Sequence, residues 1–441
     1  IIKQISPVNG SENLSNNPVL SAKIIDYRHD LMNITISSNA SGFWETIASF
    51  TDVGNGWFNV TPTNMNELDT KYYWRVTAVD PYADNLTTSE TFCFNTFTPP
   101  PFKPGWGYRK KITVDHTLIE ENLSDFPLLI DIVDSEVAAF AQDDGNDFLF
   151  TMIDGVTRLD HEIEYFDNNT GELVAWVKTN LSAVEDTVLY LYFGNELSSN
   201  QENPSAVWDD DFVMVHHLQE TSGDHMDSTG FGNDGTMINV ATQGSASGQM
   251  DGCDYFDGDN DYVVVPDSDS LDVSDMVTIS AWIHPVSWGT DLMGRIVDKN
   301  LDTSYGFFLR GASGQEHLSF YWYNGTSTDQ VNSNNYAVSL DTWQHAVVTF
   351  NQGTVTFYVD GVQQGFHSGR ATPISANNDL LYIGNRGSDL QRNFDGFMDE
   401  IRISTVSRSN SWIEAEYLNQ HDPDAFLTVS TQETSGGSPK I

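Results

Sequence analysis

The stretch Val355-Thr356-Phe357-Tyr358-Val359-Asp360-Gly361 decides the fold class. Every second residue from Val355 to Val359 is apolar, which is the period of an antiparallel strand with one face buried. The Asp360-Gly361 pair favours a two-residue turn into a further strand. The stretch therefore predicts a β-hairpin with Thr354, Thr356 and Tyr358 on its solvent side.

Comparable runs recur along all 441 residues, whereas helix-period stretches are rare. The 33 glycines and the aromatic content of 12% suit many short strands joined by tight turns. One helix is expected from Ser409 to Leu418, with Ser409 or Asn410 as its cap and Trp412, Ala415 and Leu418 on one face. A last strand follows it. The pattern predicts an all-β protein.

The length predicts about three domains. A proline-dense connector at 99–104 favours extended backbone and separates two of them. The predicted division is a β-sandwich at 1–98, this linker, a second sandwich at 105–207, a third at 208–430 and a Gly/Ser tail at 431–441.

Short motifs in each domain resemble known families. Ser6-Pro7-Val8-Asn9-Gly10 and the run 72–80 resemble prokaryotic fibronectin type III or Ig-like domains, which implies a spacer. Trp74 is then expected in the core. In the second domain, Trp106-x-Tyr108, His161-Glu162-Ile163-Glu164 and Tyr192-Phe193-Gly194-Asn195 resemble a prokaryotic surface-protein domain of unknown function.

The third domain gives the most specific resemblance. Phe256-Asp257-Gly258, Ile279-Ser280-Ala281-Trp282-Ile283, the run 343–350 and Met398-Asp399-Glu400-Ile401 occur in the order seen in concanavalin A-like jelly rolls of the laminin G and pentraxin type. The expected fold is three tandem β-sandwich domains, the last a concanavalin A-like jelly roll. The combination implies a prokaryotic, and in particular an archaeal, surface protein.

Charge and composition restrict the partners. With 20 Lys and Arg against 63 Asp and Glu, the formal net charge of −43 repels phosphate backbones, which argues against nucleic-acid binding. No apolar run reaches the roughly 18 residues that span a membrane. Because the chain starts at Ile1 without a signal-peptide pattern, we expect a mature product or an excised segment.

Cysteines and sequons bear on the compartment. Cys93 and Cys253 fall in different predicted domains, so any disulfide between them would link two domains. Nine Asn-x-Ser/Thr sequons favour a glycosylated extracellular protein: Asn13, Asn33, Asn39, Asn59, Asn85, Asn122, Asn168, Asn180 and Asn324.

The loop Asp227–Gly235 is the candidate metal site. It offers side-chain and carbonyl oxygens, which Ca²⁺ prefers, through Asp227, Asn233 and Gly235. The jelly-roll resemblance implies that the first and last strands are neighbours, so that Asp399 adds a carboxylate. The alternative is a connection whose polar side chains only cap turns. A structural calcium ion is the predicted cofactor.

Other motifs match known metal or catalytic sites less well. Asp257-Gly258-Asp259-Asn260-Asp261 opens like a calcium-binding EF-hand loop, but Tyr262 and Ser268 stand at the required glycine and glutamate. No paired-acid glycosidase strand occurs, and Glu162 and Glu164, although on one strand face, are expected to point to solvent. His216-His217 is interpreted as a structural pair. The sequence contains no predicted catalytic residue.

The aromatic stretch 318–323 is the candidate ligand surface. Alternation sends Leu318, Phe320 and Trp322 to one face and Ser319, Tyr321 and Tyr323 to the other. If the first set is core, the tyrosines are displayed, and with Phe308 and Arg310 they could stack on a sugar ring or contact a protein. The alternative is that a loop covers them.

These observations predict a non-catalytic extracellular or cell-surface protein for adhesion, glycan or protein binding, or scaffolding. Its partners would be glycans or surface proteins. A second hypothesis is a subunit of a filament or stalk, in which copies join by strand addition at an exposed edge. A third is a carbohydrate-binding accessory region of a secreted hydrolase.

Overall fold

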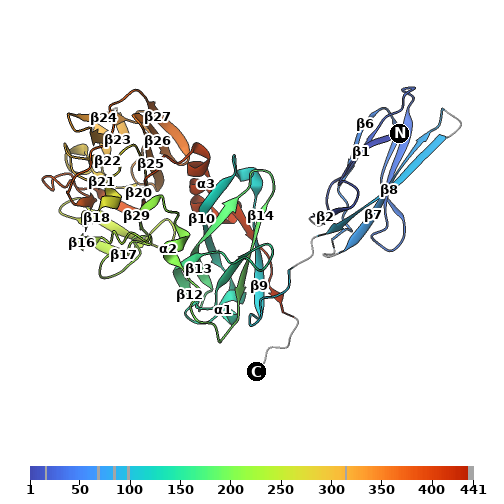
Figure 1. Ribbon diagram of the computed structural model, residues 1–441, viewed down its shortest axis with the longest axis horizontal. Helices are drawn as coiled ribbons and strands as arrows, with labels where there is room; N and C mark the ends of the chain where they lie inside the picture. The colour runs from blue at the N-terminus through green and yellow to red at the C-terminus, as the bar shows by residue number, and fades with distance from the viewer. Residues whose placement is uncertain (15–16, 67–69, 83–85, 97–99, 313–314, 436–441) are drawn as a thin grey trace. The chain divides into compact units, whose positions relative to one another are not determined.

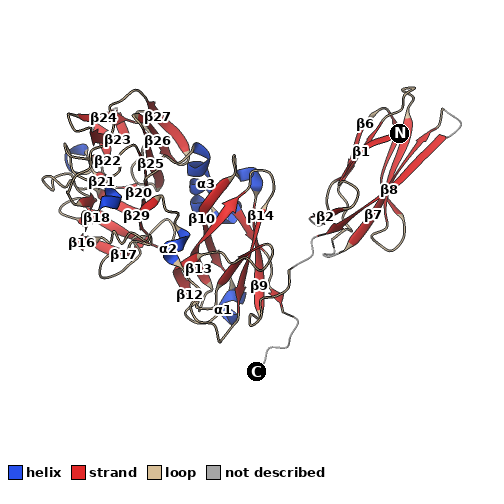
Figure 2. Ribbon diagram, in the orientation of Figure 1, coloured by secondary structure: helices blue, strands red, loops and turns tan. Residues whose placement is uncertain are grey.

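The computed structural model describes all residues except 15–16, 67–69, 83–85, 97–99, 313–314 and 436–441. Strands dominate it and helices are few and short (Figure 2). The chain divides into two compact units, Ile1–Pro101 and Phe102–Ile441. The all-β prediction is confirmed. Part of the predicted linker and most of the predicted tail lie outside the described residues.

The first unit is a sandwich of two sheets with the strand orders β1-β3-β6 and β2-β8-β7-β4-β5 (Figure 1). Alternating residues of β7 fill its core, and Trp74 is fully buried 5.1 Å from the ring of Phe92, as predicted. The strands are β1 (Ile2–Ser6), β2 (Ser11–Leu14), β3 (Leu20–Ile24), β4 (Met32–Ser38), β5 (Glu45–Val53), β6 (Gly56–Val60), β7 (Lys71–Asp80) and β8 (Leu86–Thr96).

The second unit begins with a sandwich whose sheets have the orders β10-β13-β12 and β11-β14-β9-β30, with β31 also paired to β9. Leu128, Ile130 and Trp176 belong to its core. Its elements are β9 (Tyr108–Val114), η1 (His116–Leu118), β10 (Leu123–Val133), α1 (Ser135–Phe140), β11 (Leu149–Met152), β12 (His161–Asp167), β13 (Glu172–Leu181), β14 (Thr187–Phe193), α2 (Pro204–Val207), β30 (Leu427–Val429) and β31 (Glu433–Thr434).

The jelly roll packs an eight-stranded sheet, β17-β18-β29-β20-β25-β26-β27 with β15 beside β29, on a seven-stranded sheet, β16-β19-β28-β21-β22-β23-β24. The first sheet contains β15 (Phe212–His216), β17 (Thr242–Ser247), β18 (Gly252–Asp257), β20 (Met276–Pro285), β25 (Gln344–Asn351), β26 (Thr354–Val359), β27 (Val362–His367) and β29 (Asp395–Ser404). The second contains β16 (Thr236–Ile238), β19 (Tyr262–Val265), β21 (Arg295–Asp298), β22 (Tyr305–Ala312), β23 (Gln315–Tyr323), β24 (Thr328–Asn332) and β28 (Leu381–Ile383), and the turns η2 (Asp269–Leu271) and η3 (Thr290–Leu292) lie between strands.

The jelly roll is inserted into the second sandwich, so the predicted boundaries at 430 and 431 are wrong. Its last strand ends at Ser404. The chain then forms α3 (Asn410–His421) and α4 (Pro423–Phe426) and returns to β9, where Leu427 pairs with Val114 and Thr434 with Tyr108. Residues 427–434 therefore complete a sheet that begins more than 300 residues earlier.

Helix α3 lies between the two sandwiches (Figure 1). The Ser409 hydroxyl accepts from the Trp412 amide at 3.2 Å, which confirms the predicted cap. Trp412 packs on Phe126 of the second sandwich, and Ile413 packs on Tyr358 of the jelly roll. Because α3 covers the outer face of β26, Tyr358 is buried, and the prediction that it faces solvent is wrong.

The hairpin between β26 and β27 has the predicted turn. Val359 pairs with Val362, and the two residues between them, Asp360 and Gly361, have φ angles of 51° and 73°. Positive φ at both positions is the geometry that Asp-Gly favours.

Candidate functional site

The outer face of the seven-stranded sheet carries a buried polar group made of Arg295, Asp298 and Tyr321. The Arg295 Nε and the Tyr321 hydroxyl both donate to Oδ2 of Asp298, at 2.8 and 2.6 Å. The guanidinium of Arg295 lies 4.0 Å from the ring centroid of Phe308. Burial and the neighbouring Asp298 raise the pKa of Tyr321 well above its usual value, so this phenol remains a hydrogen-bond donor.

Two loops, residues 287–294 and 385–393, cover this group; we call them the rim loops. The Thr290 amide donates to the Asn393 carbonyl at 3.1 Å, and Arg392 pairs with Asp291 at 2.5 Å. The Gly387 amide donates to Oδ1 of Asp298 at 3.3 Å. The loops are therefore bound to each other and to the sheet beneath them.

Each rim loop exposes a leucine in a left-handed backbone conformation. Leu292 has φ of 63° and is 49% exposed, and Leu390 has φ of 53° and is 40% exposed. A bulky residue in this region costs about 1–3 kcal/mol and persists only where the surroundings enforce it. Strained, exposed apolar residues on two joined loops are typical of a binding surface. The rim loops are the candidate functional site.

The structure corrects the prediction of a ligand surface at Phe308, Arg310, Tyr321 and Tyr323. Tyr321 does point away from the hydrophobic core, as its alternation indicates, but it is only 1% exposed and Phe308 only 2% exposed. Arg310 and Tyr323 are half-buried. The prediction that Phe308 and Tyr321 are displayed is wrong because Arg295 lies over both rings, and the rim loops bind Arg295 and Asp298.

A second polar cluster lies between the second sandwich and the jelly roll; we call it the charged junction. It comprises Glu162 and Glu164 of β12, His217 after β15, and Glu400 and Arg402 of β29. The Nδ1 of His217 is 2.5 Å from Glu400 and 3.3 Å from Glu164. Its Nε2 is 3.5 Å from Glu162. All five residues are buried.

Two tryptophans and one further carboxylate complete the junction. The indole nitrogens of Trp176 and Trp208 donate to Glu164 at 2.6 Å and to Glu162 at 3.0 Å. Arg402 binds Glu400 at 2.5 Å and Glu416 of α3 at 2.9 Å, and its guanidinium lies 4.3 Å from the ring centroid of Trp176. Residues from both sandwiches and from α3 are thus joined in one buried network.

The pKa values of the junction residues are shifted in different directions. Burial opposes a charge on His217, but the three surrounding glutamates outweigh it and raise the pKa of this histidine well above its usual value. Burial raises the pKa of Glu164 well above its usual value, whereas His217 and Arg402 hold the pKa of Glu400 low against burial. A buried network of this kind fixes two domains to each other. The expectation that Glu162 and Glu164 face solvent is wrong because the jelly roll covers them.

The predicted calcium ligands have other partners in the described residues. Both carboxylate oxygens of Asp227 accept hydrogen bonds, among them from the Val215 amide at 3.0 Å and the Asn233 amide at 2.8 Å. The Asn233 side chain donates to the Val213 carbonyl, and the Gly235 amide donates to the His225 carbonyl. This loop organises its own turns. Calcium binding by it stays a prediction.

Asp399 lies in different surroundings from the Asp227 loop. Its Oδ2 accepts from the amides of Gln249 and Met250 at 2.7 and 3.4 Å. Burial and the neighbouring Glu400 raise its pKa well above the usual value, which favours the neutral acid. Among the described residues, the three groups of acidic and histidine side chains spaced to hold a metal include neither Asp227 nor Asp399.

The sequons and cysteines are placed as follows. Asn59, Asn122 and Asn180 are exposed, and Asn33, Asn39, Asn168 and Asn324 are half-buried. Asn85 and the side chain of Asn13 lie outside the described residues. Glycosylation stays a prediction. Cys93 and the buried Cys253 are both free thiols in the structure.

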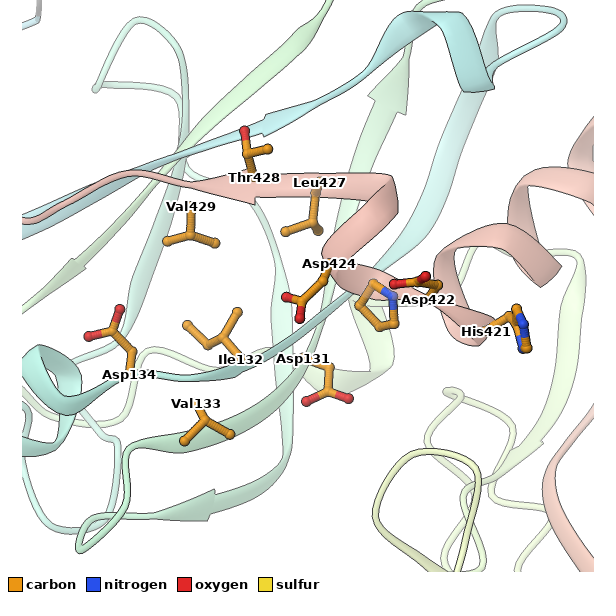
Figure 3. Close-up of a pocket in the computed structure, with 11 residues that line it drawn as sticks. Asp131, Ile132, Val133, Asp134, His421, Asp422, Asp424, Leu427, Thr428 and Val429 are labelled. Atoms are coloured by element: carbon orange, nitrogen blue, oxygen red, sulfur yellow. The ribbon is translucent and has the colours of Figure 1, made fainter.

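An acidic groove of about 610 Å³ runs along the second sandwich (Figure 3). It lies between the end of β10 and the returning chain, and Asp131, Asp134, Asp422 and Asp424 line it. Burial and nearby carboxylates raise the pKa of Asp131 to about 6. The negative charge of the groove disfavours anionic ligands. Within the described part of the chain, no helix has the length and apolar character of a membrane span.

Comparison with protein families identifies two parts of the chain. Residues 257–414 match the concanavalin A-like lectin/glucanases superfamily, and residues 144–233 match a domain of unknown function, DUF2341. The predicted concanavalin A-like jelly roll is confirmed. The second match runs from β11 past β15, so it includes the Glu162, Glu164 and His217 positions of the junction.

Solved structures show more distant likenesses, and no curated protein matches the chain. Domain 4 of AbnA, an extracellular arabinanase of Geobacillus stearothermophilus, is 18% identical with a TM-score of 0.37, over 46% of this chain and 97% of that one. The binding domain of Paraclostridial Mosquitocidal Protein 1 is 16% identical with a TM-score of 0.38, over 47% and 52%. The receptor-binding domain of botulinum neurotoxin mosaic serotype C/D is 12% identical with a TM-score of 0.39, over 48% and 51%. The chain thus spans about half of these two toxin domains.

Proposed function

We propose that this chain is a non-catalytic extracellular surface protein whose jelly roll binds a partner through the rim loops, with the second sandwich as its rigid mount. The observation that carries the proposal is the pair of strained, exposed leucines, Leu292 and Leu390, on loops held over a buried polar group. The charged junction supports the second part, because it fixes the orientation of the jelly roll.

The exposed chemistry of the rim loops favours a protein partner over a glycan. The aromatic rings that could stack on a sugar, Phe308 and Tyr321, are buried, whereas the exposed apolar side chains are aliphatic. The Arg392–Asp291 and Arg386–Asp389 pairs flank the two leucines. An apolar centre with a charged border is the ordinary composition of a protein interface.

Asparagine variants of the two leucines test this proposal. Asn tolerates positive φ, so Leu292→Asn with Leu390→Asn removes the apolar surface and preserves the backbone. The labelled chain is applied to an array of secreted and surface proteins and to a glycan array. We expect binding to protein spots that falls at least about tenfold in the double variant. Leu197→Asn, at an exposed leucine of the second sandwich, is the control. Binding to sugars alone, or binding unchanged in the double variant, would overturn the proposal.

Assembly by strand addition is a second candidate, favoured by β5. This nine-residue strand is an edge of the first unit and pairs only with β4 among the described strands. In the second sandwich, by contrast, the Asn419 side chain bonds the amide and carbonyl of Leu129 on the edge strand β10, at 2.8 and 3.0 Å. Light scattering tests this candidate. If the wild-type chain forms polymers, Ala48→Pro in β5 should abolish them. A strictly monomeric wild-type chain would rule out assembly by strand addition.

A further inference from the structure

Three aspartates meet at one end of the first unit. Asp26 and Asp30 belong to the loop between β3 and β4, and Asp80 is the last residue of β7. One carboxylate oxygen from each lies within 4.8 Å of the other two. Segments about 50 residues apart in the sequence thus direct three acids to one point.

The loop holds these aspartates in place through its own hydrogen bonds. Oδ2 of Asp26 accepts from the amides of Arg28 and Asp30 at 2.9 and 3.0 Å. Asn55 fixes the Asp26 backbone, accepting from its amide at 2.6 Å and donating to its carbonyl at 3.0 Å. The arrangement is therefore formed before any ligand arrives, which lowers the entropic cost of binding.

Asp80 supplies an independent observation that points to a cation. Its residue is only 6% exposed, and its Oδ1 accepts from the Tyr82 amide at 2.8 Å. Its Oδ2 is buried without a hydrogen-bond partner among the described residues. The nearest cation is Arg28, whose Nη2 lies 3.9 Å away, too far for a hydrogen bond, on a side chain that is 60% exposed. A buried carboxylate oxygen without a partner is costly unless a cation binds it.

We propose that Asp26, Asp30 and Asp80 bind a calcium ion. The site offers three carboxylates as hard oxygen ligands, and the exposed guanidinium of Arg28 lies beside them. Oxygens within 4.8 Å of one another can surround one Ca²⁺ ion, whose ligands lie at about 2.3–2.6 Å. With three carboxylates near the surface, we expect the affinity of an extracellular module, a Kd of about 0.1–1 mM.

Calorimetric titration of the whole chain with Ca²⁺ tests the site. Asp30→Asn removes a ligand at the more accessible position and should weaken binding at least about fivefold, and Asp80→Asn should weaken it more. Arg28→Gln removes the competing cation and should tighten binding about two- to fivefold. Asp52→Asn is the matched control, because Asp52 is exposed in the same unit and its φ of 52° suits asparagine.

Terbium distinguishes this site from the Asp227 loop. Tyr27 and Tyr82 adjoin the ligands, so they should sensitise Tb³⁺ luminescence. This signal should disappear in Asp80→Asn and in the double Tyr→Phe variant but persist in Asp227→Asn. The calcium Kd of the double Tyr→Phe variant should stay unchanged. An absence of calcium heat at 5 mM, about five times the weakest expected Kd, or equal Kd values in wild type, Asp30→Asn and Asp80→Asn, would overturn the proposal.

Discussion

The charged junction and the three-aspartate cluster both bring carboxylates close together, but they differ in the cations that offset the negative charge. In the junction the chain supplies its own cations, because His217 and Arg402 contact the glutamates at 2.5–3.5 Å. In the first unit, among the residues that the structure describes, the neighbouring cation is Arg28, 3.9 Å from Asp80. The difference teaches that spacing alone does not identify a metal site; the supply of internal counter-charge decides whether an ion is required.

Removing one of the two internal cations from the junction should have the largest effect. Arg402→Met takes the guanidinium from Glu400, which keeps His217, and leaves Glu416 buried without its ion-pair partner, which costs about 3–5 kcal/mol. Urea unfolding of the second unit at pH 7 measures this loss. Arg370→Met, at an exposed arginine 3.7 Å from Asp329, is the control and should change stability by less than about 1 kcal/mol. If both variants lose the same free energy of unfolding, the junction does not fix the two sandwiches to each other as we infer.

The buried ion pairs around His225 should also make the free energy of unfolding depend on pH. Burial opposes its charge, but hydrogen bonds to Asp254 and Glu220 outweigh burial and raise the pKa of His225 to about 9. A raised histidine pKa gives stability that is complete below about pH 6.5 and is lost as pH rises through about 9. The loss should reach about 2–3 kcal/mol.

Denaturant titrations between pH 6 and 10 measure that loss. His225→Asn should reduce the slope, because asparagine does not titrate, and the slope that remains should include the part from His217, whose pKa is also raised. His116→Asn, at a half-exposed histidine, should retain it. A wild-type slope in His225→Asn would assign the pH dependence to other groups.

Asp131 in the acidic groove tests a carboxylate whose pKa is raised by burial and by neighbouring carboxylates. Its pKa of about 6 lies above the unfolded value of 3.8, so its contribution to stability is lost as pH rises from about 3.8 through 6. Asp131→Asn should therefore stabilise the chain above pH 6 by about 1 kcal/mol, a value reduced for partial exposure. The two proteins should be equally stable below pH 4. Thermal unfolding at pH 4 and pH 8 provides the comparison.

Calcium should produce the smallest effect and should act on one unit only. At 2 mM Ca²⁺, a site with a Kd near 0.5 mM stabilises its unit by about 1 kcal/mol. Calorimetry with calcium and with EDTA should therefore shift the transition of the first unit and leave that of the second in place. A shift of the second transition would instead support the calcium ion predicted at the Asp227 loop.

Local features were predictable from the sequence because their causes are local. The Asp360-Gly361 turn and the Ser409 cap depend on residues within four positions of each other, and both are confirmed. The core position of Trp74 followed from its place in an alternating run. The concanavalin A-like fold was implied by the resemblance of several motifs, in their order, to that family.

Features that depend on what covers a strand were not predictable. Alternation placed Glu162 with Glu164 on one face correctly, but no pattern in β12 reveals that the jelly roll lies over that face. The same holds for Tyr321, which faces outward and is hidden by a loop distant in sequence. The return of residues 427–434 to β9 was missed because a strand of three residues carries no sign of its partner.

The pairing of that returning strand determines how the second unit responds to tension. Thr434 lies opposite Tyr108, so the chain enters β9 and leaves β31 at the same end of one antiparallel pair. A force applied along the chain would open these hydrogen bonds one after another, as a zipper opens, from Thr434 back toward Leu427. The jelly roll would stay unloaded until β30 and β31 had peeled away from the second sandwich, so the second unit would lengthen before the jelly roll carried any force.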